Sequence, residues 1–509
     1  MSIIFDRIKQ NAKIFPDKSA IIDGKGAAIT YLQLVERVEV RIGQLIKSVT
    51  PSFTRVALCL KESCEIPITV LALNALRVPI IPLNTELKPE QILHLLKSVD
   101  ADLVITEPTT AHLFKGNHKG VNSVDLSELS KTTESVQGFI PRIEGSDEYS
   151  QFLITLSSGS TGNPKPIILS EKNKLDRSDQ AIFLYEACSD DVILCASPFF
   201  HTLGQRLTFL PLLVGATLVQ LPRFSAKTWC DAVHYHRVTF TIPVSSHLHE
   251  LVDPLLATPH RFSSLRCLVS SSATIDNVVK KQLFETLSCN FHEMYGTSEV
   301  ATATNLKREQ SVSKPESVGI PCPNVLVKVV DENLTPCKQM EVGQIIVKSP
   351  LASSGYYNLP HITEESFVED FFLTGDLGYL DEEGYLFFVD RKKDVIITGG
   401  MNIYPSDIES VISEHTQIKE CAIVGIHDPY LGEVPVAIVK CLGDTRSVER
   451  EIRSTLQKKL APSQRPLKYF FRKHLPLTAS CKLDKKSMRR EINELKLDLS
   501  SKLRALQKT

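Results

Sequence analysis

A run of small and hydroxylated residues closed by a lysine offers the clearest chemistry in this chain. It reads Ser-Ser-Gly-Ser-Thr-Gly-Asn-Pro-Lys over residues 157–165 and follows the apolar stretch 152–156. Glycines allow the tight backbone that directs successive N–H groups at one anion, hydroxyl groups add donors, and the lysine adds charge. The run therefore predicts a phosphate-binding loop, and with it a protein that handles a nucleotide.

This loop differs from the Walker A motif, in which Gly-Lys-Ser/Thr opens a helix. Asn163 and Pro164 separate the last glycine of the run from Lys165. Taken alone, the segment is equally compatible with a flexible polar loop that joins two strands. Phosphate binding and a plain connection are therefore both open until other parts of the sequence are considered.

Five further motifs carry side chains suited to nucleotide binding and charge neutralisation. They are Pro-Phe-Phe-His-Thr-Leu-Gly at 198–204, Tyr-Gly-Thr-Ser-Glu at 295–299, Thr-Gly-Asp at 374–376, Asp-Arg-Lys-Lys-Asp at 390–394 and Leu-Pro-Leu-Thr-Ala-Ser-Cys-Lys at 475–482. With the loop, in this order and at this spacing, they resemble the motifs of the adenylate-forming (AMP-binding) superfamily. That superfamily contains acyl- and aryl-CoA synthetases, the adenylation domains of peptide synthetases and beetle luciferases. The resemblance covers nearly the whole chain and is strongest to the acyl-CoA synthetases.

The resemblance implies an enzyme in which a carboxylate attacks the α-phosphate of ATP. Because both reactants are anions, such a site must supply positive charge as the transition state forms. The β- and γ-phosphates are expected on the loop. The implied ATP-binding residues are Ser158, Gly159, Ser160, Thr161, Gly162, Lys165, Tyr295, Gly296, Thr297, Ser298, Asp376 and Arg391.

Three implied roles agree with the chemistry of the side chains. Glu299 matches the magnesium-binding glutamate of the family, and Mg2+ prefers hard oxygen ligands. Asp376 matches the residue that accepts both ribose hydroxyl groups, and Arg391 would add a ribose contact. Lys482 matches the catalytic lysine, whose ammonium bridges the substrate carboxylate and the α-phosphate. Outside this context Glu299 would be a solvated or capping residue, Thr-Gly-Asp an ordinary turn, and Lys482 a surface lysine.

Relatives of this kind rotate a small C-terminal domain after adenylation, so that a thiol can displace AMP. Lys393 falls at the hinge position of the family. Gly399 and Gly400 would lie on the face that admits the pantetheine arm of CoA, where missing side chains permit close approach. A charged linker and a flexible turn are the alternative interpretations. Because residues 399–405 resemble those of acyl-CoA synthetases, CoA is the expected acceptor.

The class of acid is only partly specified. His201 matches a catalytic histidine typical of acyl- and aryl-CoA ligases, although a histidine here could also belong to the core. Amino-acid-activating relatives usually have an aspartate in this region to pair with the substrate amine, and its absence argues against an amino acid. Ser271 and Ser272 lie in a stretch that is often glycine-rich and borders the acyl pocket. Their hydroxymethyl groups would either shorten that pocket or hydrogen-bond its walls.

Four residues depart from the family pattern. Pro166 replaces the usual glycine after the loop lysine, Glu171 a common histidine, and Ser298 the usual threonine before the glutamate. Cys481 replaces the usual glycine before Lys482. A side chain at that position restricts the backbone and would shift the ammonium by about an ångström, enough to matter for rate, unless the small residue is tolerated.

Composition supports a large enzyme without a polyelectrolyte surface. At 509 residues the chain exceeds the size at which one core stops growing. A formal net charge of −1 provides no basic face, so a nucleic acid partner is not expected. The first residues lack a secretory signal, and the longest apolar stretches, 68–81 and 209–221, are too short to span a bilayer. Twelve cysteines without zinc-ligand spacing suit a reducing compartment, so a cytoplasmic location is expected.

Strand-like and helix-like segments alternate along most of the chain. The apolar pattern predicts buried strands at residues 55–60 and 101–106 and helices at residues 67–77 and 89–99. This alternation favours an α/β fold with parallel-rich sheets. Residues 120–147 are polar and read as a surface connection. We expect a large N-terminal ATP- and acyl-binding domain, a hinge and a small mobile C-terminal α+β lid, at residues 1–390, 391–393 and 394–509.

The sequence thus predicts an AMP-forming acyl-CoA synthetase that uses ATP, Mg2+ and CoA on a fatty or aryl acid. Two alternatives stay open. One is a stand-alone adenylating enzyme that loads the pantetheine of an acyl carrier protein. The other is a degenerate homologue that binds nucleotide without catalysis, which the Pro166 and Cys481 exchanges would allow and the retained Glu299, Asp376 and Lys482 argue against.

Overall fold

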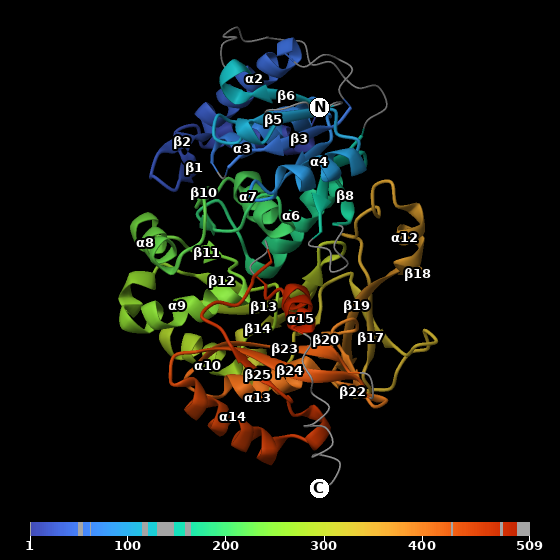
Figure 1. The fold of residues 1–509 in the computed structure, drawn as a ribbon. Helices are drawn as coiled ribbons and strands as arrows, with labels where there is room; N and C mark the ends of the chain where they lie inside the picture. Colours follow the sequence, from blue (N-terminus) through green and yellow to red (C-terminus); the bar gives the residue numbers. More distant parts are fainter. Residues whose placement is uncertain are drawn as a thin grey trace.

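The computed structural model of the chain describes residues 2–48, 54–61, 63–114, 121–129, 147–157, 164–428, 431–478 and 482–495. Its described strands form four sheets (Figure 1). Two large sheets with helices packed against them make up most of the N-terminal part of the chain. An antiparallel sheet follows, and a smaller sheet with its own helices forms the C-terminal part. This is the α/β architecture with a large N-terminal and a small C-terminal domain that the sequence predicts.

The first sheet has six strands in the order β6-β5-β3-β4-β7-β8 and is parallel except for the antiparallel pair β7–β8. Its strands are β3 (Val56–Cys59), β4 (Ile80–Pro82), β5 (Leu103–Thr106), β6 (Asn122–Asp125), β7 (Gln151–Leu156) and β8 (Pro166–Ser170). The helices of this part of the chain are α2 (Tyr31–Ser48), α3 (Glu65–Ala75), α4 (Pro89–Ser98), the short 3-10 helix η1 (Ala111–Phe114) and α5 (Leu126–Leu129). Helix α3 is apolar on all sides and almost completely buried, as such a helix must be.

The second sheet has nine strands in the order β15-β14-β13-β12-β11-β9-β10-β1-β2, parallel from β13 to β1 and antiparallel at both edges. Its strands are β1 (Ser19–Asp23), β2 (Ala28–Thr30), β9 (Val192–Cys195), β10 (Thr217–Gln220), β11 (Phe240–Thr241), β12 (Cys267–Ser270), β13 (Asn290–Thr297), β14 (Ala301–Lys307) and β15 (Ile320–Pro321). The associated helices are α1 (Ile3–Ile14), α6 (Glu171–Tyr185), α7 (Thr202–Val214), α8 (Ala226–His236), α9 (Ser245–Ala257), η2 (Pro259–Phe262), α10 (Asn277–Thr286) and α11 (Arg308–Ser313). One buried apolar cluster joins both sheets through α3 and α7, so the two sheets share a core.

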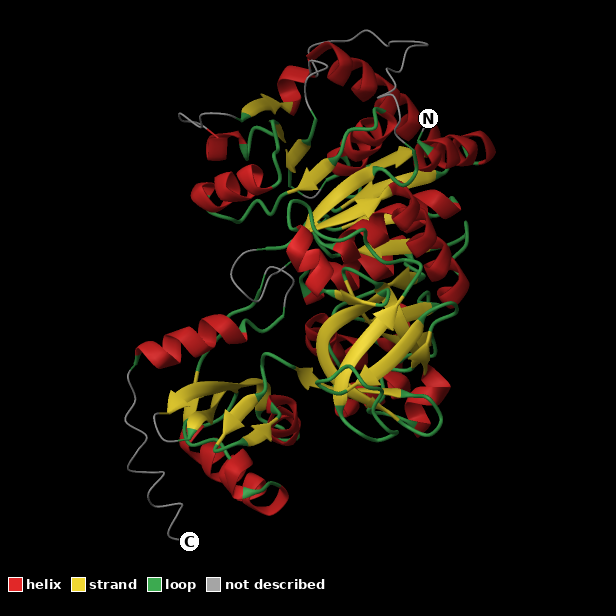
Figure 2. Cartoon of the chain, turned by 90° about the vertical axis from the view of Figure 1, so that its right-hand side faces the viewer, coloured by secondary structure: helices red, strands yellow, loops and turns green. Residues whose placement is uncertain are grey.

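The third sheet is antiparallel, with order β16-β17-β19-β18 and β20 paired to β19. Its elements are β16 (Leu326–Val330), β17 (Gly343–Lys348), α12 (Pro360–Glu365), β18 (Phe367–Val368), β19 (Phe371–Leu380) and β20 (Leu386–Arg391). Residues 381–385, whose sequence Asp-Glu-Glu-Gly-Tyr indicates a hairpin turn, connect β19 and β20. The C-terminal sheet has the order β22-β21-β24-β23 with β25 parallel to β24, and Figure 2 shows it as a small lobe with helices around it. Its elements are β21 (Ile396–Thr398), β22 (Met401–Ile403), α13 (Pro405–Ser413), β23 (Ile418–Asp428), β24 (Gly432–Cys441), α14 (Thr445–Lys459), η3 (Pro462–Gln464), β25 (Tyr469–Phe471) and α15 (Lys485–Glu494).

Residues 120–147 depart from the sequence prediction at two described places, because Leu126–Leu129 forms the short helix α5 and the residues before it form a strand. Within this stretch Asn122–Asp125 is strand β6, paired in parallel with β5, rather than part of a surface connection. A short, polar strand at a sheet edge lacks the apolar pattern that marks a buried strand, so the sequence gives no signal for it. None of the helices in the described ranges is long and apolar enough to cross a membrane.

Candidate active site

The Ser/Gly-rich run joins the antiparallel strands β7 and β8. Ser158, Gly159, Ser160, Thr161 and Gly162 lie outside the described residues. At the base of the loop, the Ser157 N–H donates to the Lys165 carbonyl at 2.9 Å, and the Lys165 N–H donates to Ser157 Oγ at 3.0 Å. Pro166 is the first residue of β8, a position at which a strand tolerates proline, and its carbonyl accepts from the Tyr357 N–H at 2.8 Å. The Pro166 exchange therefore leaves the strand pairing intact.

A buried carboxylate lies where β19 and β20 meet β13. Asp376 is 4% exposed and accepts a hydrogen bond from the Tyr295 hydroxyl at 2.9 Å. Arg391 Nε lies 3.4 Å from the other carboxylate oxygen of Asp376, because β20 pairs residue 391 opposite residue 376. Burial raises the pKa of Asp376, while Arg391 and the Tyr295 hydroxyl oppose that rise. Sheet register thus brings together two motifs that are separate in the sequence.

Lys482 from the C-terminal part reaches the same place. A bridge between Leu477 and Leu483 closes a turn, and the Thr478 N–H donates to the Lys482 carbonyl at 2.6 Å. Burial, reinforced by the positive charge of Arg391, lowers the pKa of the Lys482 ammonium to about 8, and Asp376 opposes that shift. Cys481 lies outside the described residues. Lys482 is therefore a partly buried cation within electrostatic reach of the Asp376–Arg391 pair.

The hairpin of β13 and β14 presents the Tyr-Gly-Thr-Ser-Glu motif. A Cβ on Gly296 would lie 1.8 Å from the Ala301 carbonyl oxygen, so only glycine fits this crossing of the hairpin. Beyond it, the Ser298 hydroxyl lies 3.2 Å from Thr202 Oγ1 of α7. The Glu299 carboxylate accepts from the Tyr356 hydroxyl at 2.8 Å. Ser298, which stands in place of the usual threonine, thus keeps a hydroxyl group, and this hydroxyl contacts Thr202.

Lys165 and Glu299 both contact the side chain of Tyr356, Lys165 over the ring and Glu299 at the hydroxyl. Lys165 Nζ lies 4.9 Å from the centre of the Tyr356 ring, and the hydroxyl of the same ring bonds Glu299. Thr297 Oγ1 accepts from the Val300 N–H at 3.4 Å in the turn of the hairpin. No group of three or more His, Cys, Asp or Glu side chains arranged for a metal occurs within the described ranges. A single carboxylate matches Mg2+, which is commonly held by one or two carboxylates together with substrate phosphates and water.

Arg177 on α6 is part of the site although it lies outside the motifs. Its guanidinium donates to the backbone carbonyls of Ser298 at 3.0 Å, Glu299 at 2.9 Å and Leu351 at 2.9 Å. It therefore fixes the backbone that carries Glu299. The sequence contains a signal for Arg177. This arginine shares the buried face of α6 with Ala181 and Tyr185, and a cation on a buried helix face is unusual and indicates a specific partner.

The other predicted residues occupy the edges of this region. His201 is the N-cap residue of α7, and its ring centre lies 4.4 Å from that of Phe200. Ser271 is buried and donates to the Pro243 carbonyl at 3.3 Å, so its hydroxyl is tied to the wall. Ser272 is exposed with φ +76°, a backbone region that favours glycine, which explains why the stretch is often glycine-rich.

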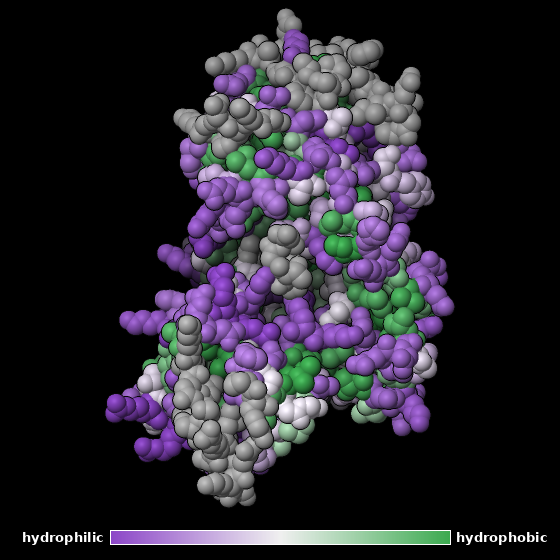
Figure 3. Space-filling view, turned by 45° about the vertical axis from the view of Figure 1, so that its right-hand side comes forward, coloured by the Kyte–Doolittle hydropathy of each residue, from purple (hydrophilic) through white to green (hydrophobic). Residues whose placement is uncertain are grey.

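The predicted hinge and CoA-binding residues lie at the junction with the C-terminal part. Lys393 follows β20, and burial together with the charge of Arg391 lowers the pKa of its ammonium. Gly399 and Gly400 form the exposed turn between β21 and β22, both with positive φ. Hydrophilic side chains gather around the hollow between the upper and lower halves of the molecule (Figure 3).

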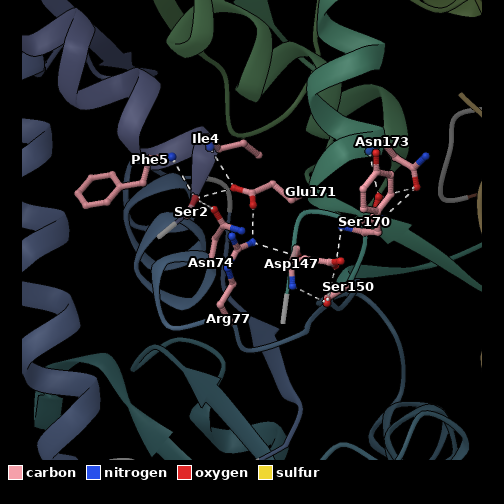
Figure 4. Close-up of polar contacts among 11 residues, drawn as sticks. Ser2, Ile4, Phe5, Asn74, Arg77, Asp147, Ser150, Ser170, Glu171 and Asn173 are labelled. Carbon is pink, nitrogen blue, oxygen red and sulfur yellow. Dashed lines mark hydrogen bonds and ion pairs between the residues drawn. The ribbon is translucent and has the colours of Figure 1, made fainter. Parts of the chain in front are cut away.

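Glu171, which stands where a histidine is common, makes several buried polar contacts (Figure 4). Its carboxylate is 1% exposed, forms an ion pair with Arg77, and accepts from Ser2 Oγ at 2.7 Å and the Ile4 N–H at 3.0 Å. These contacts connect the start of α6 with α1 and with the end of α3. The glutamate at position 171 therefore helps to hold helix α1 against α6 and the end of α3.

Comparison with known proteins agrees with this geometry. Residues 8–357 match the family described as AMP-binding enzyme, and residues 407–482 match the AMP-binding enzyme C-terminal domain. A 2-succinylbenzoate–CoA ligase of Bacillus mycoides (strain KBAB4) is 30% identical over 96% of this chain and 98% of its own length. The corresponding ligase of Bacillus cereus (strain Q1) is 29% identical with the same coverage.

Solved structures show the same architecture. The o-succinylbenzoate CoA synthetase (MenE) of Bacillus subtilis, in complex with its acyl-adenylate intermediate OSB-AMP, superposes with a TM-score of 0.85 at 27% identity, covering 95% of this chain and 97% of that one. ATP-bound MatB from Rhodopseudomonas palustris gives a TM-score of 0.85 at 25% identity, with 96% and 99% coverage. The chain therefore belongs to the AMP-binding enzyme family, as an AMP-forming ligase of the acyl-CoA synthetase type with ATP and CoA as substrates.

Proposed function

We propose that this enzyme converts an aryl carboxylic acid into its CoA thioester, with Lys482 as the catalytic lysine. The observation that carries the proposal is the convergence of Lys482, Asp376 and Arg391 beside Tyr295. In the first half-reaction a carboxylate oxygen of the acid attacks the α-phosphorus of ATP, and the bond to pyrophosphate breaks. The Lys482 ammonium neutralises the oxygens of both reactants as charge redistributes between them. Asp376 and Arg391 hold the ribose.

The phosphate side of the site is assigned to the loop and to the hairpin. Ser158, Gly159, Ser160, Thr161 and Gly162 would direct donors at the β- and γ-phosphates, with Lys165 at the base of the loop. Tyr295, Gly296, Thr297 and Ser298 would contact the nucleotide. Glu299 would hold Mg2+, which supplies charge neutralisation of the phosphates when bound. Arg177 supports this role, since it fixes the backbone carbonyl of Glu299.

The second half-reaction requires a different arrangement of the C-terminal part. We place the boundaries at residues 1–390, 391–393 and 394–509, with rotation at Lys393. Rotation would move Lys482 away and bring Gly399 and Gly400 to the tunnel of the pantetheine arm, where absent side chains allow close approach. The CoA thiolate then attacks the acyl carbonyl, and AMP leaves. His201, at the start of α7, would shape the end of this tunnel next to the acyl carbonyl.

An aryl acid is favoured over a fatty acid by the relatives, whose names specify 2-succinylbenzoate. Ser271 and Ser272 would line the acyl pocket, Ser271 through its backbone and Ser272 through its exposed hydroxyl. The alternative of a carrier-protein acceptor has no support from these relatives, which are CoA ligases by name.

The test is release of pyrophosphate from ATP and Mg2+ in the presence of aryl, fatty and amino acids, each with and without CoA. We expect release with aryl acids, completion of the thioester only with CoA, and a loss of at least a hundredfold in Lys482→Ala. Lys458→Ala, an exposed lysine on α14, is the matched control and should behave as the unchanged enzyme. Full activity of Lys482→Ala, or release with fatty acids alone, would contradict the proposal.

A further inference from the structure

Three buried polar side chains connect helices α6 and α7 to the strand that enters the phosphate loop. Lys174 of α6 donates to Gln205 Oε1 of α7, and Gln205 Nε2 donates to Thr155 Oγ1 of β7 at 3.0 Å. Lys174, Gln205 and Thr155 are 4%, 0% and 2% exposed, and the two helices pack against each other (Figure 1). We call these three residues the Lys174 network.

Thr155 lies close to the base of the phosphate loop. It stands two residues before Ser157, whose N–H and hydroxyl pair with Lys165 on the other side of the loop. On β8, Ile167 pairs with Thr155 two residues after Lys165. A shift of Thr155 relative to α7 would therefore move both ends of the loop.

The same two helices also hold the hairpin that completes the proposed phosphate site. Arg177, one turn after Lys174 on α6, donates to the Ser298 carbonyl at 3.0 Å. Thr202, one turn before Gln205 on α7, has its hydroxyl 3.2 Å from Ser298 Oγ. Residues three apart in a helix lie on one face, so each helix connects the loop base with the hairpin through neighbouring side chains.

The buried amine of Lys174 contributes little to stability. Within the described ranges it forms no ion pair with a carboxylate, and its acceptor there is the Gln205 amide. Burial, and then the charges of Arg177 and Arg206, lower the pKa of Lys174 well below its usual range. A methionine would fill similar space without a polar group to desolvate. A residue that served stability alone would be apolar at this position.

The contact with Lys174 determines how the Gln205 side chain is oriented. It directs the amide oxygen toward α6, which leaves the amide N–H group to donate to Thr155. Without this contact the amide could turn over, and Thr155 would lose a fixed donor. We propose that Lys174, through Gln205, positions Thr155 and the base of the phosphate loop for the β- and γ-phosphates of ATP. This rests on the proposed function, which assigns these phosphates to the loop, and Lys174 is a positioning residue because it reaches the loop only through its two partners.

The experiment compares the binding of ATP and AMP, which share the adenosine and the α-phosphate but differ in the β- and γ-phosphates. Isothermal titration calorimetry with Mg2+ gives both Kd values for the unchanged enzyme, Lys174→Met, Thr155→Val and the double variant. Lys172→Met is the matched control, because Lys172 lies on the same helix and pairs with Asp176 on a half-exposed face. Thermal unfolding of each protein monitors folding.

Lys174→Met and Thr155→Val should each weaken ATP binding about three- to tenfold, as expected for loss of a hydrogen bond, and should leave AMP binding unchanged. The double variant should bind ATP no more weakly than the weaker single variant, because both residues act through one network. Lys174→Met should have a Tm no lower than that of the unchanged enzyme, since a buried amine is removed. Lys172→Met should change neither Kd value.

Three results would overturn the inference. They are ATP binding that is unchanged in both single variants, equal weakening of ATP and AMP as a merely structural role would give, and fully additive losses in the double variant. Failure of the proposed function looks different. An unchanged enzyme that binds ATP no more tightly than AMP would contradict the assignment of the loop itself, and the inference with it. If no acid supports pyrophosphate release, the proposed reaction fails, while the comparison of ATP with AMP still decides the role of Lys174.

Discussion

At the level of single residues, the charge of Lys482 depends on where the chain places it. An exposed lysine has a pKa near 10.5, but burial beside Arg391 lowers that of Lys482 to about 8. Asp376 supplies the opposing negative charge. The ammonium is therefore protonated at neutral pH yet begins to lose its proton only slightly above it.

This gives a prediction for the pH dependence of adenylation. Because the reaction needs the ammonium, kcat/KM for pyrophosphate release should be level below pH 8 and fall about tenfold per pH unit above it. The lowered pKa sets this window, since the free enzyme determines kcat/KM. Lys482→Arg should be slower but should show no such fall below pH 10, because a guanidinium stays protonated. A wild-type profile that stays level to pH 10 would contradict the assignment.

At the level of elements, the Glu171 carboxylate joins three helices. It begins α6, pairs with Arg77 at the end of α3, and accepts hydrogen bonds from the start of α1. Both side chains of the ion pair are buried, with 1% of Glu171 and 13% of Arg77 exposed. Neutralising the carboxylate of such a buried pair is strongly destabilising, because the ion pair with Arg77 and the charge-assisted hydrogen bonds of the carboxylate are lost.

We therefore expect Glu171→Gln to lower the stability of the N-terminal part by about 3 kcal/mol. Urea unfolding followed by tryptophan fluorescence measures the change, because Trp229 lies in the core of this part. Glu39→Gln, on the exposed side of α2, is the control and should change stability by less than about 0.5 kcal/mol. An equal, small effect of both exchanges would show that the attachment of α1 does not depend on Glu171.

At the level of the whole molecule, the C-terminal lobe is joined to the larger lobe close to the proposed hinge. The Ser406 N–H donates to Asp390 Oδ2 at 3.0 Å, and the Ser406 hydroxyl donates to the Val389 carbonyl at 2.6 Å. Farther away, Lys419 lies 3.7 Å from Asp253, an exposed pair of little energetic weight. Rotation at residues 391–393 would break the two Ser406 contacts.

Ser406→Ala should therefore weaken the arrangement in which Lys482 faces Asp376. Loss of one neutral hydrogen bond should slow ATP–pyrophosphate exchange about two- to tenfold. Thioester formation from a preformed acyl-adenylate should be unaffected or faster, because it would use the rotated arrangement. Ser447→Ala, whose hydroxyl bonds Glu451 within α14, controls for loss of a hydroxyl elsewhere in the lobe. Equal slowing of both half-reactions would argue against a contact specific to one arrangement.

Much of the architecture was predictable from local sequence. The buried strand at 55–60 and the helix at 89–99 are β3 and α4, because apolar periodicity is a local property of the chain. The helix expected from Pro67 begins at Glu65, two residues earlier, since proline is tolerated in a first turn whose N–H groups have no helical partners. Of the antiparallel sheet of residues 326–391 only the hairpin turn at 381–385 was predicted, because the register and order of its strands depend on tertiary contacts.

The sequence by itself determined the family, the order of the motifs and the residue types that the chemistry needs. Tertiary structure decided which of these side chains meet: Asp376 with Tyr295 and Arg391, and Lys482 within electrostatic reach of Asp376 and Arg391. It also revealed Arg177, Lys174 and the Glu171 contacts, which belong to no motif. The physical reason is that motifs reflect local backbone requirements, whereas burial, charge balance and pKa depend on neighbours that lie far away in the chain.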